Sequence, residues 1–373
     1  MKAKITITGF RRVLWKIFSG IFFYTALVML VFMLLLQLRP VQTYFTKQVL
    51  SMVSDRTEHS ISLDRIQISW LDRVNLKDFL IRDLEDDTLL YSRDLMVNYK
   101  VWDLINGEYL DVEEVESNDI RLKLTKYDSL SKLNLSQFLK SLKKDTIKKE
   151  SKPIYVDQVT FSKLKLTLRD KTKASDHSKL DFADLRLDIP DFTLANLAIE
   201  SDTISGHVIQ MIGTEPNIDL EIQNFTTKFQ FSNTALSVDD LEFTTPTSHV
   251  ADSLEFFYNG LDDFGSFVDS VSFILHFNQS KISKEDFKKV TGLDQIKADI
   301  SIDGILWGTV GDFNIEETRF GYGNSYLIGG VSCFGLPDIS QTFVLADLTD
   351  SRVLPDDLRP HIGEYANNLQ QMG

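Results

Sequence analysis

The sequence has one cysteine, few histidines and fewer basic than acidic residues, and each shortage excludes a class of protein. Cys333 cannot form a disulfide within the chain, so this is not a small secreted domain held together by disulfides. The six histidines show no spacing typical of a metal site. A net charge of −14 with a pI ≈ 4.9 argues against a nucleic-acid-binding protein, which needs basic patches for phosphate.

The sequence also lacks any catalytic motif that a simpler structure does not explain better. Gly304, Gly308 and Gly311 are spaced loosely like a phosphate-binding loop, but the Lys-Ser/Thr of such a loop is missing, which favours turns between strands. The acidic run Asp83–Thr88 lacks the glycine and the final glutamate of a calcium-binding loop, which favours a solvated turn. TSH at 247–249 has no G-x-S-x-G motif beside it. We therefore predict a protein that is not an enzyme and that has neither a cofactor nor a metal.

An uncharged apolar run, Ile17–Leu38, dominates the N-terminal part of the chain. At ~1.5 Å per residue, about 20 apolar residues cross a hydrocarbon core of ~30 Å, so this run is long enough to span a membrane. It exceeds the roughly 7–15 apolar residues of a cleaved signal and lacks a small-residue cleavage site, which favours a permanent anchor. A buried core helix is the other alternative.

Charges on either side of this run predict its orientation. Lysines and arginines crowd the N-terminal side, so we expect a cytoplasmic N-terminus and a translocated remainder of the chain. The predicted order is a basic cytoplasmic tail at 1–16, a transmembrane helix at 17–38, a juxtamembrane helix at 39–60 and a large exported region at 61–373.

From about Ile61 the apolar residues alternate with polar ones, which is the pattern of strands with one buried face. The alternation continues in segments such as DLEIQNFTTKFQF and SVSFILHF, so we predict a mainly β fold. Asn106-Gly107 is a tight-turn signal that predicts a hairpin between two of the strands.

Two of the strand segments form a repeat with a separation of 44 residues, which predicts a reused strand–turn–strand unit. A chance match between alternating segments is the alternative. The matched apolar positions are Val112, Val115, Ile120, Leu122 and Leu124 in the first copy and Val156, Val159, Leu164, Leu166 and Leu168 in the second.

Three amphipathic helices are predicted between or after the strands. The first is LSKLNLSQFLKSLKK, with a lysine-rich loop behind it. The second is SKEDFKKVTG, where Ser283 is a suitable N-cap and Gly292 a suitable stop. The third runs from about Pro355 to Leu369. These helices look too small to cover so much apolar sheet. Either the sheet closes on itself as a sandwich or barrel, or it forms a groove whose apolar lining, rich in phenylalanine, meets acyl chains.

The residues resemble a known family. The basic tail, the single span and the stretches at 51–99 and 302–338 are similar to the N-terminal region of TamB, the translocation and assembly module protein of the AsmA-like group, in its Bacteroidota form. IQISW (Ile66–Trp70), IRDLEDDTLLY (Ile81–Tyr91) and LMVNY (Leu95–Tyr99) are the most specific parts of the likeness. Proteins of this family are much longer, so the chain resembles an N-terminal piece or a truncated member.

The resemblance implies an inner-membrane anchor followed by an elongated, curved, antiparallel β-groove, taco-like, that crosses the periplasm and has an apolar interior. It also implies movement of phospholipid toward the outer membrane, or assistance to outer-membrane protein assembly together with an Omp85-type barrel. The expected partners are then phospholipid acyl chains and the inner membrane. The family supplies no catalytic residue.

We predict a lipid-lining role for six residues, and an anchored β-sandwich ectodomain that binds a protein or a glycan is the alternative. The predicted lining residues are Leu122, Leu124, Leu166, Leu168, Phe229 and Phe231.

Overall fold

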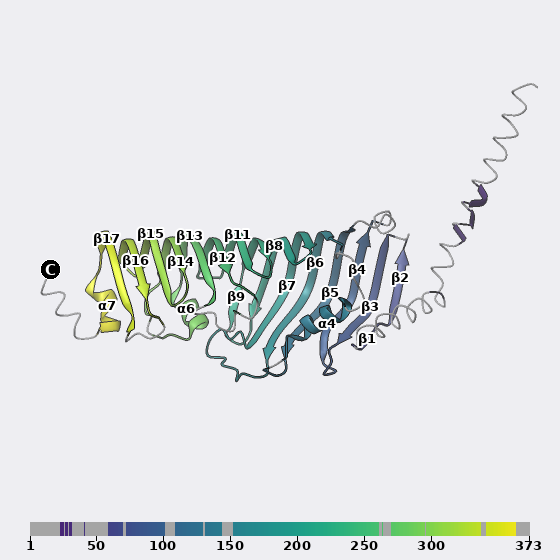
Figure 1. The fold of residues 1–373 in the computed structure, drawn as a ribbon, viewed down its shortest axis with the longest axis horizontal. Helices are drawn as coiled ribbons and strands as arrows, with labels where there is room; N and C mark the ends of the chain where they lie inside the picture. The colour runs from purple at the N-terminus through teal and green to yellow at the C-terminus, as the bar shows by residue number, and fades with distance from the viewer. Residues whose placement is uncertain are drawn as a thin grey trace, which may run out of the picture.

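The computed structural model describes residues 59–69, 72–100, 109–129, 131–143, 152–260, 263, 270–294, 296–336 and 341–362, with a few residues between 23 and 41. These residues form one 17-stranded sheet that runs along the length of the molecule (Figure 1). The strands are β1 (Ile61–Ser62), β2 (Arg65–Ser69), β3 (Arg73–Arg82), β4 (Thr88–Tyr99), β5 (Leu110–Lys126), β6 (Ile154–Asp170), β7 (Asp184–Glu200), β8 (Thr203–Glu215), β9 (Leu220–Ile222), β10 (Asn224–Phe231), β11 (Ala235–Thr244), β12 (His249–Phe257), β13 (Ser272–Ile282), β14 (Ile300–Gly308), β15 (Asp312–Tyr322), β16 (Ser325–Phe334) and β17 (Phe343–Arg352). The mainly β prediction is confirmed.

The strands pair largely in the order of the chain, and the expected antiparallel arrangement holds for every pair but one. β5 and β6 are parallel. A parallel pair needs a crossover that returns the chain to the starting edge of the sheet. Helix α4 (Asn134–Lys143) lies in this crossover, so the expectation of a purely antiparallel sheet is wrong at this point.

The 44-residue repeat is the parallel pair itself. Val112 lies opposite Val156, and Leu122 lies opposite Leu166, so the separation of the repeat equals the register of β5 against β6. The predicted turn inside each copy is wrong, because each copy is one continuous strand of 17 residues. Asp119 and Lys163 lie within these strands, and each has a positive φ, 62° and 58°. Both strands leave this one residue out of the ladder without a change of register, so the position is a kink within a continuous strand rather than a turn.

Irregular positions of this kind line up across the sheet. The first bulge line, as we call it, crosses β3, β5 and β6 at Asp78, Asp119 and Lys163, where both paired strands leave one residue out of the ladder and the register is unchanged. A second bulge line crosses the later strands, where the register shifts in every pair from β10–β11 to β16–β17. Bulges bend a strand and increase its twist, so aligned bulges bend the whole sheet. The positive-φ residues of the second bulge line are Asp240, Asp252, Gln279, Gly304, Gly329 and Asp350.

Buried hydroxyl groups bond to the backbone that the second bulge line leaves unpaired. Ser280 Oγ accepts from Ala251 N (3.0 Å) and donates to Ala251 O (3.2 Å). Thr227 Oγ1 donates to Asp239 O (2.9 Å), and Thr318 Oγ1 donates to a carbonyl of its own strand. All three side chains are buried. Because buried backbone groups need partners, these hydroxyls make the bend in the sheet stable.

The helices agree with their local sequence signals. Helix α6 (Lys284–Thr291) has Ser283 as its N-cap, and Gly292 ends it with φ 73°. Both predictions are confirmed. Helix α4 begins at Asn134, and helix α7 (Pro355–Ile362) begins at the predicted proline. The rest of the third predicted helix, the Asn106-Gly107 turn and most of the lysine-rich loop lie outside the described residues.

Most of the two N-terminal helices predicted at 17–38 and 39–60 also lies outside the described residues. Within the part of the chain that is described, no helix has both the length and the apolar character needed to cross a membrane.

Candidate functional site

Four of the six predicted lining residues form two direct pairs on the parallel strands. Leu122 lies opposite Leu166, and Leu124 lies opposite Leu168. All four side chains are half-buried. Leu166 in turn lies opposite Leu187 on β7, which packs against a buried cluster. This first cluster consists of Ile120, Leu164 and Ile189.

The other two predicted residues lie on β10. Phe231 is opposite Ile204 on β8, and Phe229 is opposite Gly206, whose lack of a side chain leaves room for the ring. Both phenylalanines are half-buried. Phe229 packs against a second cluster, which consists of Val112, Val156, Val159, Leu194 and Val208.

The structure places the two groups of lining residues on one continuous apolar face. Phe161, Phe192 and Met211 pack against both clusters and so connect them. The rings of Phe161 and Phe192 are stacked, with centroids 5.9 Å apart. The six residues do not meet at a single point, because the β5–β6 leucines and the β10 phenylalanines pack around different clusters.

The apolar face continues far beyond the residues that the sequence indicated. From Phe229, cross-strand partners lead through seven further strands to β17. We call this the apolar row. Its side chains are half-buried, except for the exposed alanine on β17. The row consists of Phe229, Val238, Leu254, Leu275, Leu306, Ile315, Val331 and Ala346.

Only one residue of the apolar row, Phe229, was among the predicted lining residues. Leu254 and Leu275 follow the same period-two alternation, which is the signal that could have found them. Alternation gives the face of each strand separately, whereas the row depends on the register between strands.

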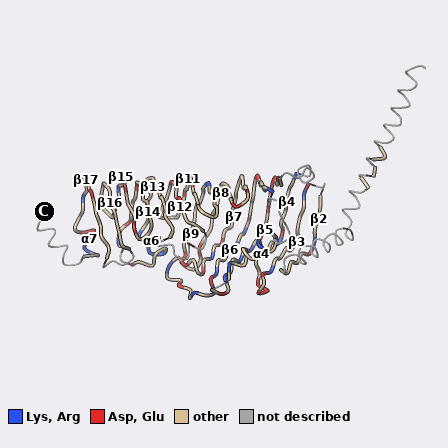
Figure 2. Tube along the Cα trace, in the orientation of Figure 1, with Lys and Arg blue, Asp and Glu red and all other residues tan. Residues whose placement is uncertain are grey.

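The opposite face of the same strands carries charged side chains together with exposed apolar ones. Trp307 follows Leu306 directly, lies on the other face and is 40% exposed. Lys228 pairs with Asp240 across this face at 2.7 Å, and Lys165 lies 3.7 Å from Asp188. Charged residues of both signs are scattered along the whole sheet (Figure 2). The two faces therefore differ in charge, because the apolar row contains no charged side chain.

The helices are each tied by their first turn to a hairpin turn of the sheet. Asn134 of α4 donates to Asp83 in the β3–β4 turn (2.9 Å). Ser248 in the β11–β12 turn donates to Asp286 of α6 (2.6 Å). The third tie, from Ser325 to Asp357 of α7, is also 2.6 Å. These turns lie at the same side of the sheet, where the strands end, and we call this side the helix edge. Helices α6 and α7 are seen there, along the lower side of the sheet in Figure 1.

The two motifs considered for chemistry are parts of these ties. Ser248 donates to Asp286, whereas His249 Nδ1 lies 3.4 Å from Thr244 Oγ1, so the adjacent serine and histidine face different partners. Burial alone would raise the pKa of Asp286, but hydrogen bonds from Ser248 and neighbouring hydroxyls outweigh it and lower the pKa below its ordinary value. The arrangement is a helix cap.

The acidic run at 83–88 is a hairpin turn between β3 and β4. Asp83 is buried and accepts hydrogen bonds from the backbone of Glu85 and Asp87 and from the Tyr127 hydroxyl (2.6 Å). The Asp83 carboxylate thus stabilises the turn and also holds Asn134 of α4 in place. Within the described ranges, no group of three or more histidine, cysteine or acidic side chains is arranged to hold a metal. Gly304 and Gly308 lie in β14, with φ of 144° and 134°, as strand and turn residues.

Comparison of the sequence with models of known protein families gives no match, and comparison with curated proteins finds no similar one. The function must therefore be argued from the geometry of the apolar face.

Proposed function

We propose that the chain is an inner-membrane-anchored periplasmic protein of cell-envelope biogenesis. Its apolar sheet face forms a groove that carries phospholipid toward the outer membrane, with or without a part in outer-membrane protein assembly. The observation that carries this proposal is the apolar row, which crosses eight strands without a charged side chain.

The burial of the apolar row favours a surface that meets something apolar from outside. Leu254, Leu275 and Leu306 remain half-buried although they lie in the middle of the sheet. The helices α4, α6 and α7 have only 10, 8 and 8 residues. Half-buried aliphatic side chains gain free energy when an acyl chain covers them, at roughly 25 cal/mol per Å² of apolar area removed from water.

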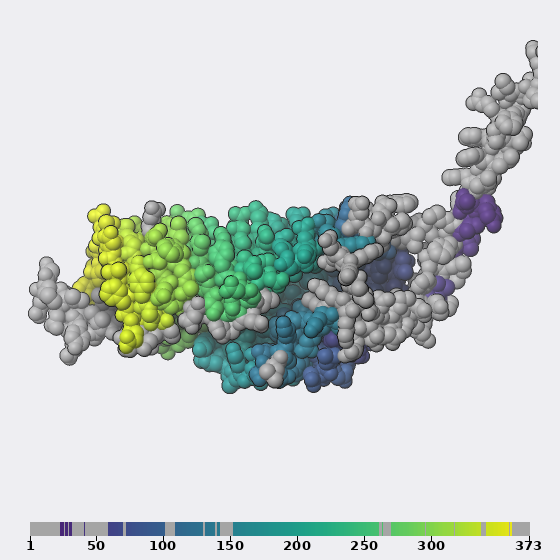
Figure 3. Space-filling model, viewed as in Figure 1, coloured from purple at the N-terminus to yellow at the C-terminus, as the bar shows by residue number. Residues whose placement is uncertain are grey.

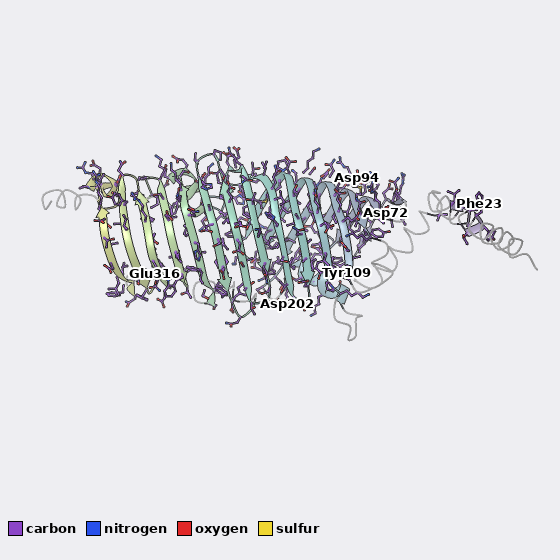
Figure 4. The ribbon with its side chains drawn as sticks, turned by 90° about the horizontal axis from the view of Figure 1, so that it is seen from above. Phe23, Asp72, Asp94, Tyr109, Asp202 and Glu316 are labelled. Atoms are coloured by element: carbon purple, nitrogen blue, oxygen red, sulfur yellow. The ribbon has the colours of Figure 1, made fainter. Side chains whose placement is uncertain are left out.

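The bulge lines support a groove rather than a flat sheet. The strands are seen along their length in Figure 1 and again in Figure 4, although the second view is turned by 90° about the horizontal axis. A straight strand would be seen end-on in one of the two views, so the strands bend, as the bulge lines predict. In the space-filling view the surface is recessed beside α4, between the upper and lower parts of the long central strands (Figure 3). A bent sheet with an apolar inner face is suited to a chain-like ligand.

The anchor and the destination are parts of the same proposal. The basic residues before Ile17–Leu38 favour a cytoplasmic N-terminus, which puts β1 nearest the inner membrane. The resemblance to TamB supports transport toward the outer membrane and an Omp85-type barrel as partner of the full-length architecture.

The test compares two neighbouring positions on opposite faces. Full-length protein is reconstituted with phospholipid that carries a photoactivatable group in its acyl chain, and covalent labelling is measured. Leu306→Asp puts a charge into the apolar row and is expected to abolish labelling, because a carboxylate would have to be desolvated beneath the acyl chain. Trp307→Asp, on the opposite face, is expected to leave labelling unchanged.

Circular dichroism of both variants checks that the sheet is intact. Equal labelling of the two variants would reject the groove. The described strands form one sheet, so no observation favours the alternative, a β-sandwich ectodomain that binds a protein or glycan.

A further inference from the structure

A cavity of about 270 Å³ lies at the helix edge near the C-terminal end of the sheet. We call it the end cavity. It is formed by the last residues of β15, the first residues of β16, the loop after α6 and the residue that follows β17. Its lining consists of Ile296, Phe320, Tyr322, Ser325, Tyr326, Leu327 and Val353.

The hydroxyl groups of Ser325 and Tyr322 in this lining already have partners within the protein. Ser325 Oγ donates to Asp357 (2.6 Å) and accepts from Leu354 N (2.9 Å). The Tyr322 hydroxyl accepts from Lys297 N (2.9 Å). An occupant therefore meets apolar carbon and finds few free hydrogen-bonding groups, which selects for hydrocarbon.

The end cavity opens on the face that carries the apolar row. Ile302 and Leu306 are an even number of residues apart on β14 and so share a face. Ile302 lies opposite Phe320, and Phe320 lies opposite Leu327. The floor of the cavity thus continues the apolar face past the second bulge line.

We propose that the end cavity receives the terminal part of a single acyl chain of a lipid that lies along the apolar row. The proposal rests on the proposed function and adds a fixed position for the chain end. Ligand sites for whole drug-sized molecules measure roughly 300–1,000 Å³, so this cavity is suited to part of one chain and not to a two-chain lipid.

The test uses two phospholipid probes with the full-length protein. One has a diazirine at the end of the acyl chain and the other has it next to the carbonyl, and labelled peptides are mapped by mass spectrometry. The chain-end probe is expected to label Phe320, Tyr322 and Leu327, and the carbonyl-side probe to label the apolar row around Leu275 and Leu306.

A matched pair of variants tests the cavity directly. Leu327→Trp fills space for about two methylene groups, which predicts about a tenfold loss of chain-end labelling there, while labelling of the apolar row stays unchanged. Ile328→Trp, on the other face of the same strand, is expected to change neither. If thermal unfolding shows that Leu327→Trp does not fold, Val353→Trp at the exposed rim replaces it.

The remaining outcomes separate this proposal from the proposed function. Labelling of the apolar row by both probes, with none in the cavity, would overturn the proposal for the end cavity but not the proposed function. No labelling of either place would overturn both. Labelling of the cavity only after removal of residues 363–373 would show that this segment occupies it, which would also overturn the proposal.

Discussion

At the scale of single residues, the bend in the sheet depends on a few buried hydroxyl groups. Ser280 is fully buried and bonds to both the N–H and the C=O of Ala251 across the second bulge line. A bulge leaves ladder groups without partners, and a small hydroxyl can serve as both donor and acceptor to them. The same role of Thr227 and Thr318 suggests that these positions set the curvature of the apolar face.

We predict that Ser280→Ala lowers the free energy of unfolding by about 1–3 kcal/mol, because two buried backbone groups lose their partner. Urea denaturation followed by circular dichroism measures the change. Ser272→Ala, at a half-buried serine of the same strand, is the control and is expected to stay within about 0.5 kcal/mol of the unmodified protein. An equal effect at both positions would contradict a special role for the bulge hydroxyl.

Asp286 gives a prediction for pH. Because hydrogen bonds lower its pKa in the folded protein, despite burial, it stabilises the fold above its unfolded pKa of about 3.9, and this stabilisation is lost as pH falls through the folded pKa. Asp286→Asn should therefore be less stable than the unmodified protein at pH 7, by about 1–3 kcal/mol, with the difference shrinking below pH 4.

Urea titrations at pH 7, 5 and 3 test this narrowing. Asp240→Asn is the control, because Asp240 is exposed and pairs only across the surface with Lys228. A difference for Asp286→Asn that is constant with pH would show that the carboxylate charge is not what ties α6 to the turn.

At the scale of elements, local signals in the sequence were sufficient for some features and not for others. The cap and stop of α6 follow from Ser283 and Gly292, because both act within one turn of chain. The 44-residue separation of the repeat equals the register of β5 against β6, so the sequence already indicated which residues pair. The turn predicted inside each copy of the repeat was wrong, because residues such as asparagine and aspartate favour turns and strand irregularities alike, and only pairing on both sides decides between them.

The apolar row shows the same limit at the candidate site. Its members on β12 to β16 alternate as predicted, but their alignment depends on the register of each pair, which is set by contacts between strands. The parallel crossover through α4 was missed for a related reason, since alternation gives no direction of pairing.

The kink inside β6 predicts opposite effects of glycine at two nearby lysines. Lys163 has φ 58°, so Lys163→Gly should stabilise the protein by about 1 kcal/mol through relief of a left-handed conformation. Lys165 lies in regular strand, so Lys165→Gly should destabilise it by roughly 0.5–1 kcal/mol. Chemical denaturation of both variants checks the signs. Destabilisation by both would contradict a left-handed conformation at Lys163.

At the scale of the whole molecule, the described part of the chain combines a long sheet with three short helices. The bulge lines bend the strands and the helix ties hold short helices at the helix edge. The apolar row crosses β10 to β17 on the far side of the second bulge line from that edge. Such a molecule should gain stability from an apolar ligand that binds the folded sheet and not the unfolded chain.

We therefore predict that phospholipid raises the stability of the exported region. A ligand at 100 times its Kd adds about 2.7 kcal/mol to the free energy of unfolding when it binds only the folded state. Thermal unfolding in lipid-free detergent and in the same detergent with added phosphatidylglycerol measures this gain. Leu306→Asp should remove the gain, whereas Trp307→Asp should retain it, because only the first lies on the apolar face. A gain that survives Leu306→Asp would mean that lipid stabilises the protein elsewhere, for instance at Ile17–Leu38, and not along the apolar row.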